Sequence, residues 1–242
     1  MDTLVYMEQL KTHRLFYKTK YFVLGLIPLL CLCNCNTQVR EDEYLVYTKA
    51  EKKYFMEALF YNGKTTKWNS TSLTFSIEGK FTPSQIEFIM NSLEFISALK
   101  GLPKFERVES NAKIRIHMPG SDKGFESSNS SDEKWRGFTT SKLGFLSREL
   151  ILSEIFVKPT LTDLEVYTTL HHELLHALGL SGHPKSKFPF SSALGVRYFY
   201  TLEPEISPEI PEIDCKALMF LYNKKIPVKV AQTDVSILLG IK

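Results

Sequence analysis

Two histidines four residues apart constrain this 242-residue chain more than any other feature. They are His172 and His176, within the run His171-His172-Glu173-Leu174-Leu175-His176. On a helix, residues at this spacing project from one face, one turn apart, so the two imidazoles can bind a single Zn²⁺. Glu173 lies beside His172, where its carboxylate can reach a metal-bound water without being a ligand. Because apolar residues flank the run, and burying unpartnered imidazoles is costly, we expect a metal site rather than an exposed polar face.

Two histidines leave such a site incomplete, because a catalytic zinc usually has three protein ligands and a water. Gly179 can end the helix in the left-handed conformation, and His183 follows four residues later. We therefore expect His183 to be the third ligand. The alternative is a surface His183, with the site completed by a downstream glutamate: Glu203, Glu205, Glu209 or Glu212.

Local patterns predict three strands and two long helices. The strands are runs in which apolar residues alternate or cluster, at 73–77, 112–118 and 150–157. Capping-box sequences beginning at Thr82 and Thr162 predict where the helices start, over 83–99 and through the histidine run. The polar stretch 119–142 is predicted to be a long loop. This order indicates an α/β or α+β domain with the long helices packed on one sheet.

The run from His172 to His183 resembles the H-E-x-x-H-x-x-G-x-x-H signature of the metzincin zinc endopeptidases, and Ala177-Leu178-Gly179-Leu180 is most similar to the matrixin branch. There is one departure. The third histidine of the family stands three residues after the glycine, a position that Gly182 holds here, so His183 must reach one residue further. The conformational freedom of Gly182 makes a bulge feasible at this point.

The resemblance covers residues 70–242 and implies a metzincin-like fold of the α/β (α+β) class. That fold has a twisted, mostly parallel sheet with an antiparallel edge strand, two long helices, a zinc-site helix, a Met-turn and a C-terminal helix. Ala217–Tyr222 resembles the Met-turn, which implies that Met219 packs beneath the histidines without being a ligand. Residues 230–240 resemble the closing helix.

The resemblance also implies an activity. A zinc ion on His172, His176 and His183 would activate a water, and Glu173 would act as general base in the hydrolysis of a peptide bond. The substrate would be a protein or peptide that pairs antiparallel to the edge strand before the zinc helix, here 151–157. The alternatives are a catalytically inactive metzincin-fold binding protein at the cell surface and a zinc hydrolase with a non-peptide substrate.

The N-terminus has the layout of a secretory signal, with basic residues followed by an apolar run from Tyr21 to about Cys33. The run is short for a membrane-spanning helix, which needs about 20 residues. Leu32-Cys33-Asn34-Cys35 resembles a bacterial lipoprotein signal, which implies cleavage before Cys35 and its acylation. We expect an exported lipoprotein anchored to a cell-envelope membrane, in the periplasm or at the cell surface, or otherwise a secreted protein.

We therefore expect three parts: a signal peptide at 1–35, a tether or short helical segment at 36–67 with its helix at 48–60, and a zinc metallopeptidase domain at 68–242. The net charge of +3, from 30 basic and 27 acidic residues, gives no argument for a nucleic-acid partner. After signal cleavage only Cys215 remains besides Cys35, so no internal disulfide framework is expected. We expect a monomer whose partners are its substrate and, through the lipid anchor, a membrane.

Overall fold

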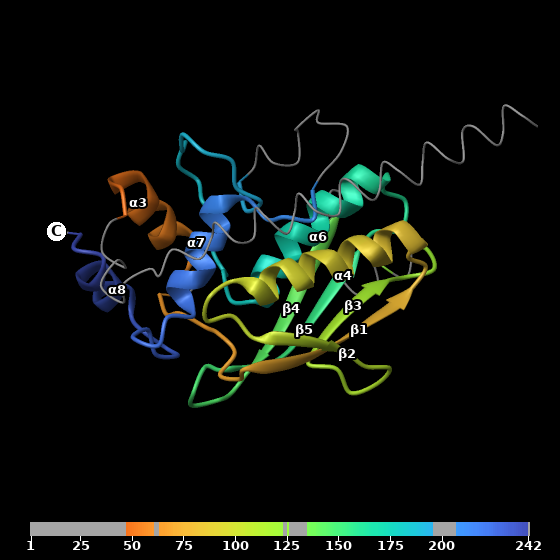
Figure 1. Ribbon diagram of the computed structural model, residues 1–242, viewed down its shortest axis with the longest axis horizontal. Coiled ribbons are helices and arrows are strands. Elements are labelled where there is room, and N and C mark those ends of the chain that lie inside the picture. Colours follow the sequence, from red (N-terminus) through yellow and green to blue (C-terminus); the bar gives the residue numbers. More distant parts are fainter. Residues whose placement is uncertain (1–46, 61–62, 123–124, 126–134, 196–206, 242) are drawn as a thin grey trace, which may run out of the picture. The chain divides into compact units, whose positions relative to one another are not determined.

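The computed structural model describes residues 47–60, 63–122, 125, 135–195 and 207–241 (Figure 1). The chain divides into two compact units, Met1–Leu45 and Val46–Lys242, and every described residue belongs to the second. The predicted signal peptide, Cys35 and the first part of 36–67 lie outside the described residues. Within the described part, no helix is both long enough and apolar enough to cross a membrane.

One five-stranded sheet supports the histidine helix, with the strand order β2-β1-β3-β5-β4. The strands are β1 Ser72–Gly79, β2 Lys104–Arg107, β3 Ile114–Met118, β4 Gly137–Leu143 and β5 Leu150–Val157. β1 runs parallel to β2 and β3, and β3 runs parallel to β5, while β4 is antiparallel to β5. The sheet is therefore mostly parallel with an antiparallel edge strand, which confirms the predicted fold class.

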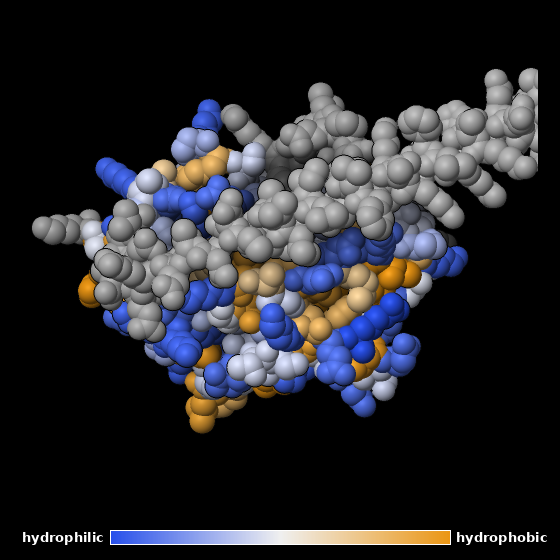
Figure 2. Space-filling view, viewed as in Figure 1, coloured by the Kyte–Doolittle hydropathy of each residue, from blue (hydrophilic) through white to orange (hydrophobic). Residues whose placement is uncertain are grey.

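Strand β4 corrects two expectations. All but its last residue lies in 119–142, which was predicted to be a loop, and it pairs along its length with β5. As a result β5 is flanked by both β3 and β4. The segment 151–157 is therefore not an edge strand, whereas β4 is one. The sequence of β4 is mostly polar, as suits an edge strand that pairs on one side only. At the turn between β4 and β5, Phe145 is 96% exposed and Leu146 is 76% exposed. This turn lies at the lower left of Figure 1, and hydrophobic surface projects there in the same view in Figure 2.

Two long helices, α4 Pro83–Ala98 and α6 Asp163–Ala177, lie side by side on one face of the sheet (Figure 1). Each begins with the predicted capping box. In α4 the Thr82 side chain accepts from the backbone N–H of Gln85, whose side chain accepts from the N–H of Thr82, and Thr162 and Glu165 do the same in α6. These caps fix where each helix begins and hence which residues of α6 face the sheet.

Three further helices complete the described unit: α3 Lys49–Ala58, α7 Glu212–Leu221 and α8 Gln232–Leu238. α3 matches the short helix expected at 48–60, but it is no loose tether, because Tyr54, Phe55 and Ala58 are fully buried and the Phe55 ring stacks on Phe220 of α7. These three buried residues stand at positions i, i+1 and i+4 and so share one face of the helix, which gains its stability by packing. The described end of 36–67 thus belongs to the same compact unit as the sheet.

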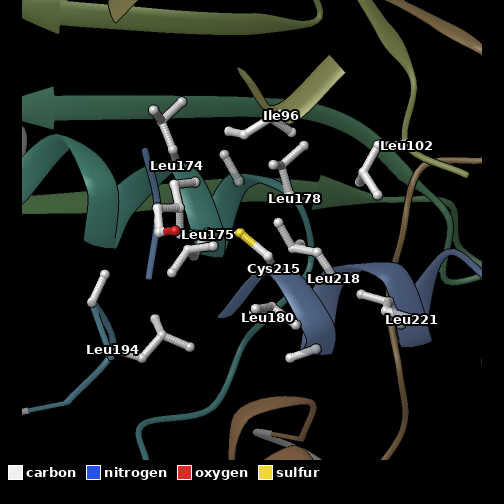
Figure 3. Packing of buried hydrophobic residues seen from close by; sticks show 14 of the residues in the cluster. Ile96, Leu102, Leu174, Leu175, Leu178, Leu180, Leu194, Cys215, Leu218 and Leu221 are labelled. Carbon is white, nitrogen blue, oxygen red and sulfur yellow. Dashed lines mark hydrogen bonds between the residues drawn. The ribbon is translucent and has the colours of Figure 1, made fainter. Parts of the chain in front are cut away.

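The core continues between α6 and α7. Figure 3 shows Leu174, Leu175 and Leu178 gathered around Cys215 and Leu218. Burial raises the pKa of the Cys215 thiol to about 12, so the thiol is protonated and packs as a small apolar group. The histidine helix is therefore held on one side by the sheet and on another by α7.

Candidate metal centre

Three imidazoles converge at the C-terminal end of α6. The Nε2 atoms of His172 and His176 are 3.0 Å apart, and the Nε2 atom of His183 lies 3.2 Å from the first and 3.1 Å from the second. Among the described residues, these three side chains form the group that could hold a metal ion. Glu209 and Glu212 are not part of it, while Glu203 and Glu205 lie outside the described residues.

The hydrogen bonds of the two helix histidines fix their tautomers. His172 Nδ1 lies 2.8 Å from the carbonyl oxygen of Ala193, and His176 Nδ1 lies 2.6 Å from that of Leu180. A carbonyl oxygen only accepts, so each Nδ1 must carry the proton. Burial lowers the pKa of His172 to about 4 and that of His176 to about 3, so both rings are neutral. Their Nε2 lone pairs therefore face each other, an arrangement that a bound cation would stabilise.

The spacing of the three nitrogens fits a tetrahedral ion. A zinc ion with bonds of about 2.0–2.1 Å keeps its nitrogen ligands about 3.3–3.4 Å apart, close to the distances found here. Three nitrogens on one side also leave a fourth position for a water or a substrate atom. The donor set, three neutral imidazoles with anchored Nδ1 atoms, suits Zn²⁺.

The chain leaves α6 at Gly179, as predicted. Gly179 has a φ of 102°, and a Cβ atom there would lie 2.2 Å from the carbonyl oxygen of Thr66. Gly182 does not use the conformational freedom that was expected of it, because its φ is not in the positive range. It is needed for space instead, since a Cβ would lie 1.9 Å from the carbonyl oxygen of Glu57. The extra residue thus sits against the end of α3, and His183 follows into the group.

Glu173 points to the edge of the sheet. Its side chain is only 6% exposed, and Oε2 accepts a hydrogen bond of 2.7 Å from Thr139 Oγ1 of β4. Burial raises the pKa of Glu173 to about 7, although the bond from Thr139 works in the opposite direction. A carboxyl group whose pKa lies near neutrality can both take up and release a proton.

Met219 does not lie in a turn. Residues 217–221 form the last part of α7, and Met219 is partly buried against the core. The apolar residues of this segment recur at helical spacing, which favours a helix over a turn. They are Ile213, Ala217, Leu218 and Leu221. The contact that the structure does show behind His172 is with the loop before α7, where the carbonyl oxygen of Ala193 lies against Nδ1.

A buried carboxylate that the sequence patterns did not predict holds this loop. Asp214 of α7 is fully buried, and its carboxylate accepts from Ala193 N at 2.7 Å, from Ser192 Oγ at 2.9 Å and from the hydroxyl of Tyr54. Burial raises the pKa of Asp214 to about 6 against the effect of these bonds. An acidic residue within the apolar pattern of a helix was the available signal, because buried acids require partners.

Comparisons with known proteins give little similarity in sequence. No protein-family model matches this sequence, and no curated protein matches it. Among solved structures, the chain is similar to high choriolytic enzyme 1, a hatching enzyme zinc-protease from the medaka fish Oryzias latipes. The identity is 14% and the TM-score 0.38, over 65% of this chain and 94% of that one.

Two structures of myroilysin are also similar. One has 21% identity and a TM-score of 0.29, over 64% of this chain and 63% of that chain. The other has 18% identity and a TM-score of 0.28, over 61% of this chain and 66% of that chain. The chain thus spans just under two thirds of each. Because the TM-scores are low, these similarities carry no argument about the site. The fold is defined by the sheet order of this chain, and the candidate site by the geometry of its histidines.

Proposed function

We propose that this protein is a zinc-dependent endopeptidase. The observation that carries the proposal is the convergence of three Nε2 atoms, two with their lone pairs fixed toward each other, on the helix that also bears the buried Glu173. The metzincin-type order of these residues in the sequence supports the same reaction class. His172, His176 and His183 are the proposed ligands.

A bound zinc would supply a Lewis acid and a water of lowered pKa. The contribution of the chain is orientation and proton transfer. Ala193 and Leu180 hold the His172 and His176 rings by their Nδ1 atoms. Thr139 holds Oε2 of Glu173, and we propose that the carboxylate takes the proton from the attacking water and passes it to the leaving amine.

We propose β4 as the strand on which a substrate peptide docks. β4 pairs with β5 alone within the described sheet, so its other edge offers backbone N–H and C=O groups. Thr139 connects this strand directly to Glu173. An extended peptide added to β4 would therefore run along the strand that positions the proposed base.

We also propose, from the sequence pattern alone, that the protein is exported and anchored to a membrane by acylation at Cys35. Metabolic labelling with a radioactive fatty acid tests this, since Cys35→Ser should abolish incorporation. Label retained in that variant would contradict the anchor.

Zinc content and proteolysis, measured on the same purified protein, test the function. We expect about one zinc per chain, cleavage of casein, and loss of cleavage but not of zinc in Glu173→Ala. Glu94→Ala, on the exposed face of α4, is the matched control. Zinc binding without cleavage of any protein substrate would contradict the peptidase. Unchanged zinc binding in His183→Ala would remove that residue from the ligand set.

A further inference from the structure

The segment that carries His183 is tied to the C-terminal end of α3. Gly182 N donates to Ala58 O at 2.8 Å, and Ser181 Oγ donates to Leu59 O at 3.3 Å. Both acceptors belong to the end of a helix, where backbone carbonyls lack partners within the helix. The two bonds hold the residues just before His183 and give these carbonyls hydrogen-bond partners.

Glu57 holds the same segment on the other side of His183. Its Oε2 atom accepts from the backbone N–H of Lys185 at 2.8 Å and from that of Ser186 at 3.0 Å, and its Oε1 atom accepts from Ser186 Oγ at 2.5 Å. Burial alone would raise the pKa of Glu57, but the bonds from Ser186 and Lys185 outweigh it and lower the pKa. An ionised carboxylate that accepts three hydrogen bonds fixes the two residues following Pro184 to the helix.

A second side chain of α3 holds another ligand. Tyr54 lies three residues before Glu57, on the same side of the helix. Its hydroxyl donates to Asp214, which also accepts from the backbone N–H of Ala193. The carbonyl oxygen of Ala193 then accepts from Nδ1 of His172. One helix thus reaches two of the three histidines by separate routes.

From these contacts we propose that α3 is a positioning element of the metal centre and that Glu57 is a positioning residue for His183. The proposal rests on the proposed function only in naming zinc as the ion. It explains why the histidine can stand one residue later than in the metzincin signature. The additional residue, Gly182, fits against the backbone of α3 because it has no side chain, and Glu57 then holds the following residues in place.

Three variants separate positioning from simple stability. Glu57→Ala removes the carboxylate, and Glu57→Gln keeps an amide oxygen for the two N–H groups and an amide donor for Ser186 Oγ. Glu51→Ala is the matched control, because Glu51 lies on the same helix and hydrogen bonds to Lys216 and Thr48 rather than to the histidine segment. Loss of these bonds lowers stability without touching residues 181–186.

The first measurement is zinc affinity by chelator competition, accompanied by the visible spectrum of the cobalt-substituted protein. We expect Glu57→Ala to weaken zinc binding about 10- to 100-fold, the usual effect of removing a group that orients a ligand, and to lower the tetrahedral cobalt absorption. Glu57→Gln should stay within a few-fold of the wild type, and Glu51→Ala should keep its affinity. Equal losses in Glu57→Ala and Glu51→Ala, or no loss in Glu57→Ala, would overturn the proposal.

The second measurement is hydrogen exchange in the metal-free protein, which separates this proposal from the proposed function. The amides of Lys185 and Ser186 should be protected in the wild type and in Glu57→Gln, and should lose about tenfold or more of their protection in Glu57→Ala. This result in a chain that binds no zinc would support the role of α3 in placing the segment while refuting the peptidase. Unchanged protection in Glu57→Ala would refute the positioning role whatever the zinc affinity.

Discussion

Replacing Glu173 with glutamine should stabilise the metal-free protein at alkaline pH and should abolish the proposed peptidase turnover. Burial raises the pKa of this carboxyl from 4.5 to about 7, so the folded state favours the protonated form. As pH rises from 4.5 through about 7, the folded protein must ionise a carboxyl that is ionised more easily when the chain is unfolded. Each pKa unit corresponds to about 1.4 kcal/mol, so the penalty at pH 8 is roughly 3 kcal/mol.

Glutamine avoids this penalty and can still accept the hydrogen bond from Thr139. Urea unfolding in the presence of a chelator, at several pH values between 4.5 and 8, measures the difference in unfolding free energy. The advantage of Glu173→Gln should be small at pH 4.5 and should grow to its full size above pH 7. The exposed Glu94→Gln should show no such growth. A Glu173→Gln variant that is less stable than the wild type at pH 8, or whose difference does not depend on pH, would refute the reasoning.

Further predictions concern the residues that support the proposed site and the competition between protons and zinc for its histidines. Tyr54→Phe removes the hydroxyl that donates to the Asp214 carboxylate, and should lower the free energy of unfolding in urea by about 1.5–3 kcal/mol. Gly179→Ala combines a φ of 102° with a Cβ 2.2 Å from a carbonyl oxygen, and should lower both the thermal midpoint and the zinc affinity. Because the pKa values of His172 and His176 are lowered to about 4 and about 3, protons should not compete for these ligands until the pH falls toward those values. With two of the three ligands neutral in this range, at most one proton competes with the ion. The logarithm of the zinc affinity should therefore fall by at most about one per pH unit between pH 6.5 and 5.

Each of these has its own control. Tyr167→Phe keeps the ring stacked on Phe88 and should change the unfolding free energy by no more than about 0.5 kcal/mol. Gly63 has a φ of 73° but no atom within 4 Å of its Cβ position, so Gly63→Ala reports backbone strain without a clash. An effect as large as that of Gly179→Ala would show that the clash contributes nothing. If the logarithm of the zinc affinity instead fell by about three per pH unit, all three imidazoles would have ordinary pKa values, and the prediction would be wrong.

The sequence predicted the parts of this protein that depend on neighbouring residues. Both long helices begin just after Thr82 and Thr162, as the capping-box sequences predict, because a cap is made within four residues. The spacing of His172 and His176 follows from the pitch of a helix, and the exit at Gly179 follows from the ease with which glycine adopts a positive φ. None of these features needs a distant partner.

The features that the sequence did not predict depend on distant partners. β4 contains the polar run Thr139-Thr140-Ser141-Lys142, which becomes a strand because β5 pairs with it. The resemblance implied a turn at Met219, but that residue lies on a helix, and Asp214 of the same helix anchors the loop at Ala193. The bond from Lys185 N to Glu57 joins residues 128 positions apart, and no local pattern announces such a contact.

The way α3 meets the histidine segment also bears on how the proposed metal centre would form. The supports of the ligands come from residue 57 at one end of the unit and residue 214 at the other, while the ligands themselves lie at 172–183. Contacts between such remote positions form after the intervening chain has been brought together, because loop closure must precede them. During synthesis the three histidines can therefore gain both supports only once α7 has emerged, so binding of the proposed zinc ion would report that these distant contacts have formed.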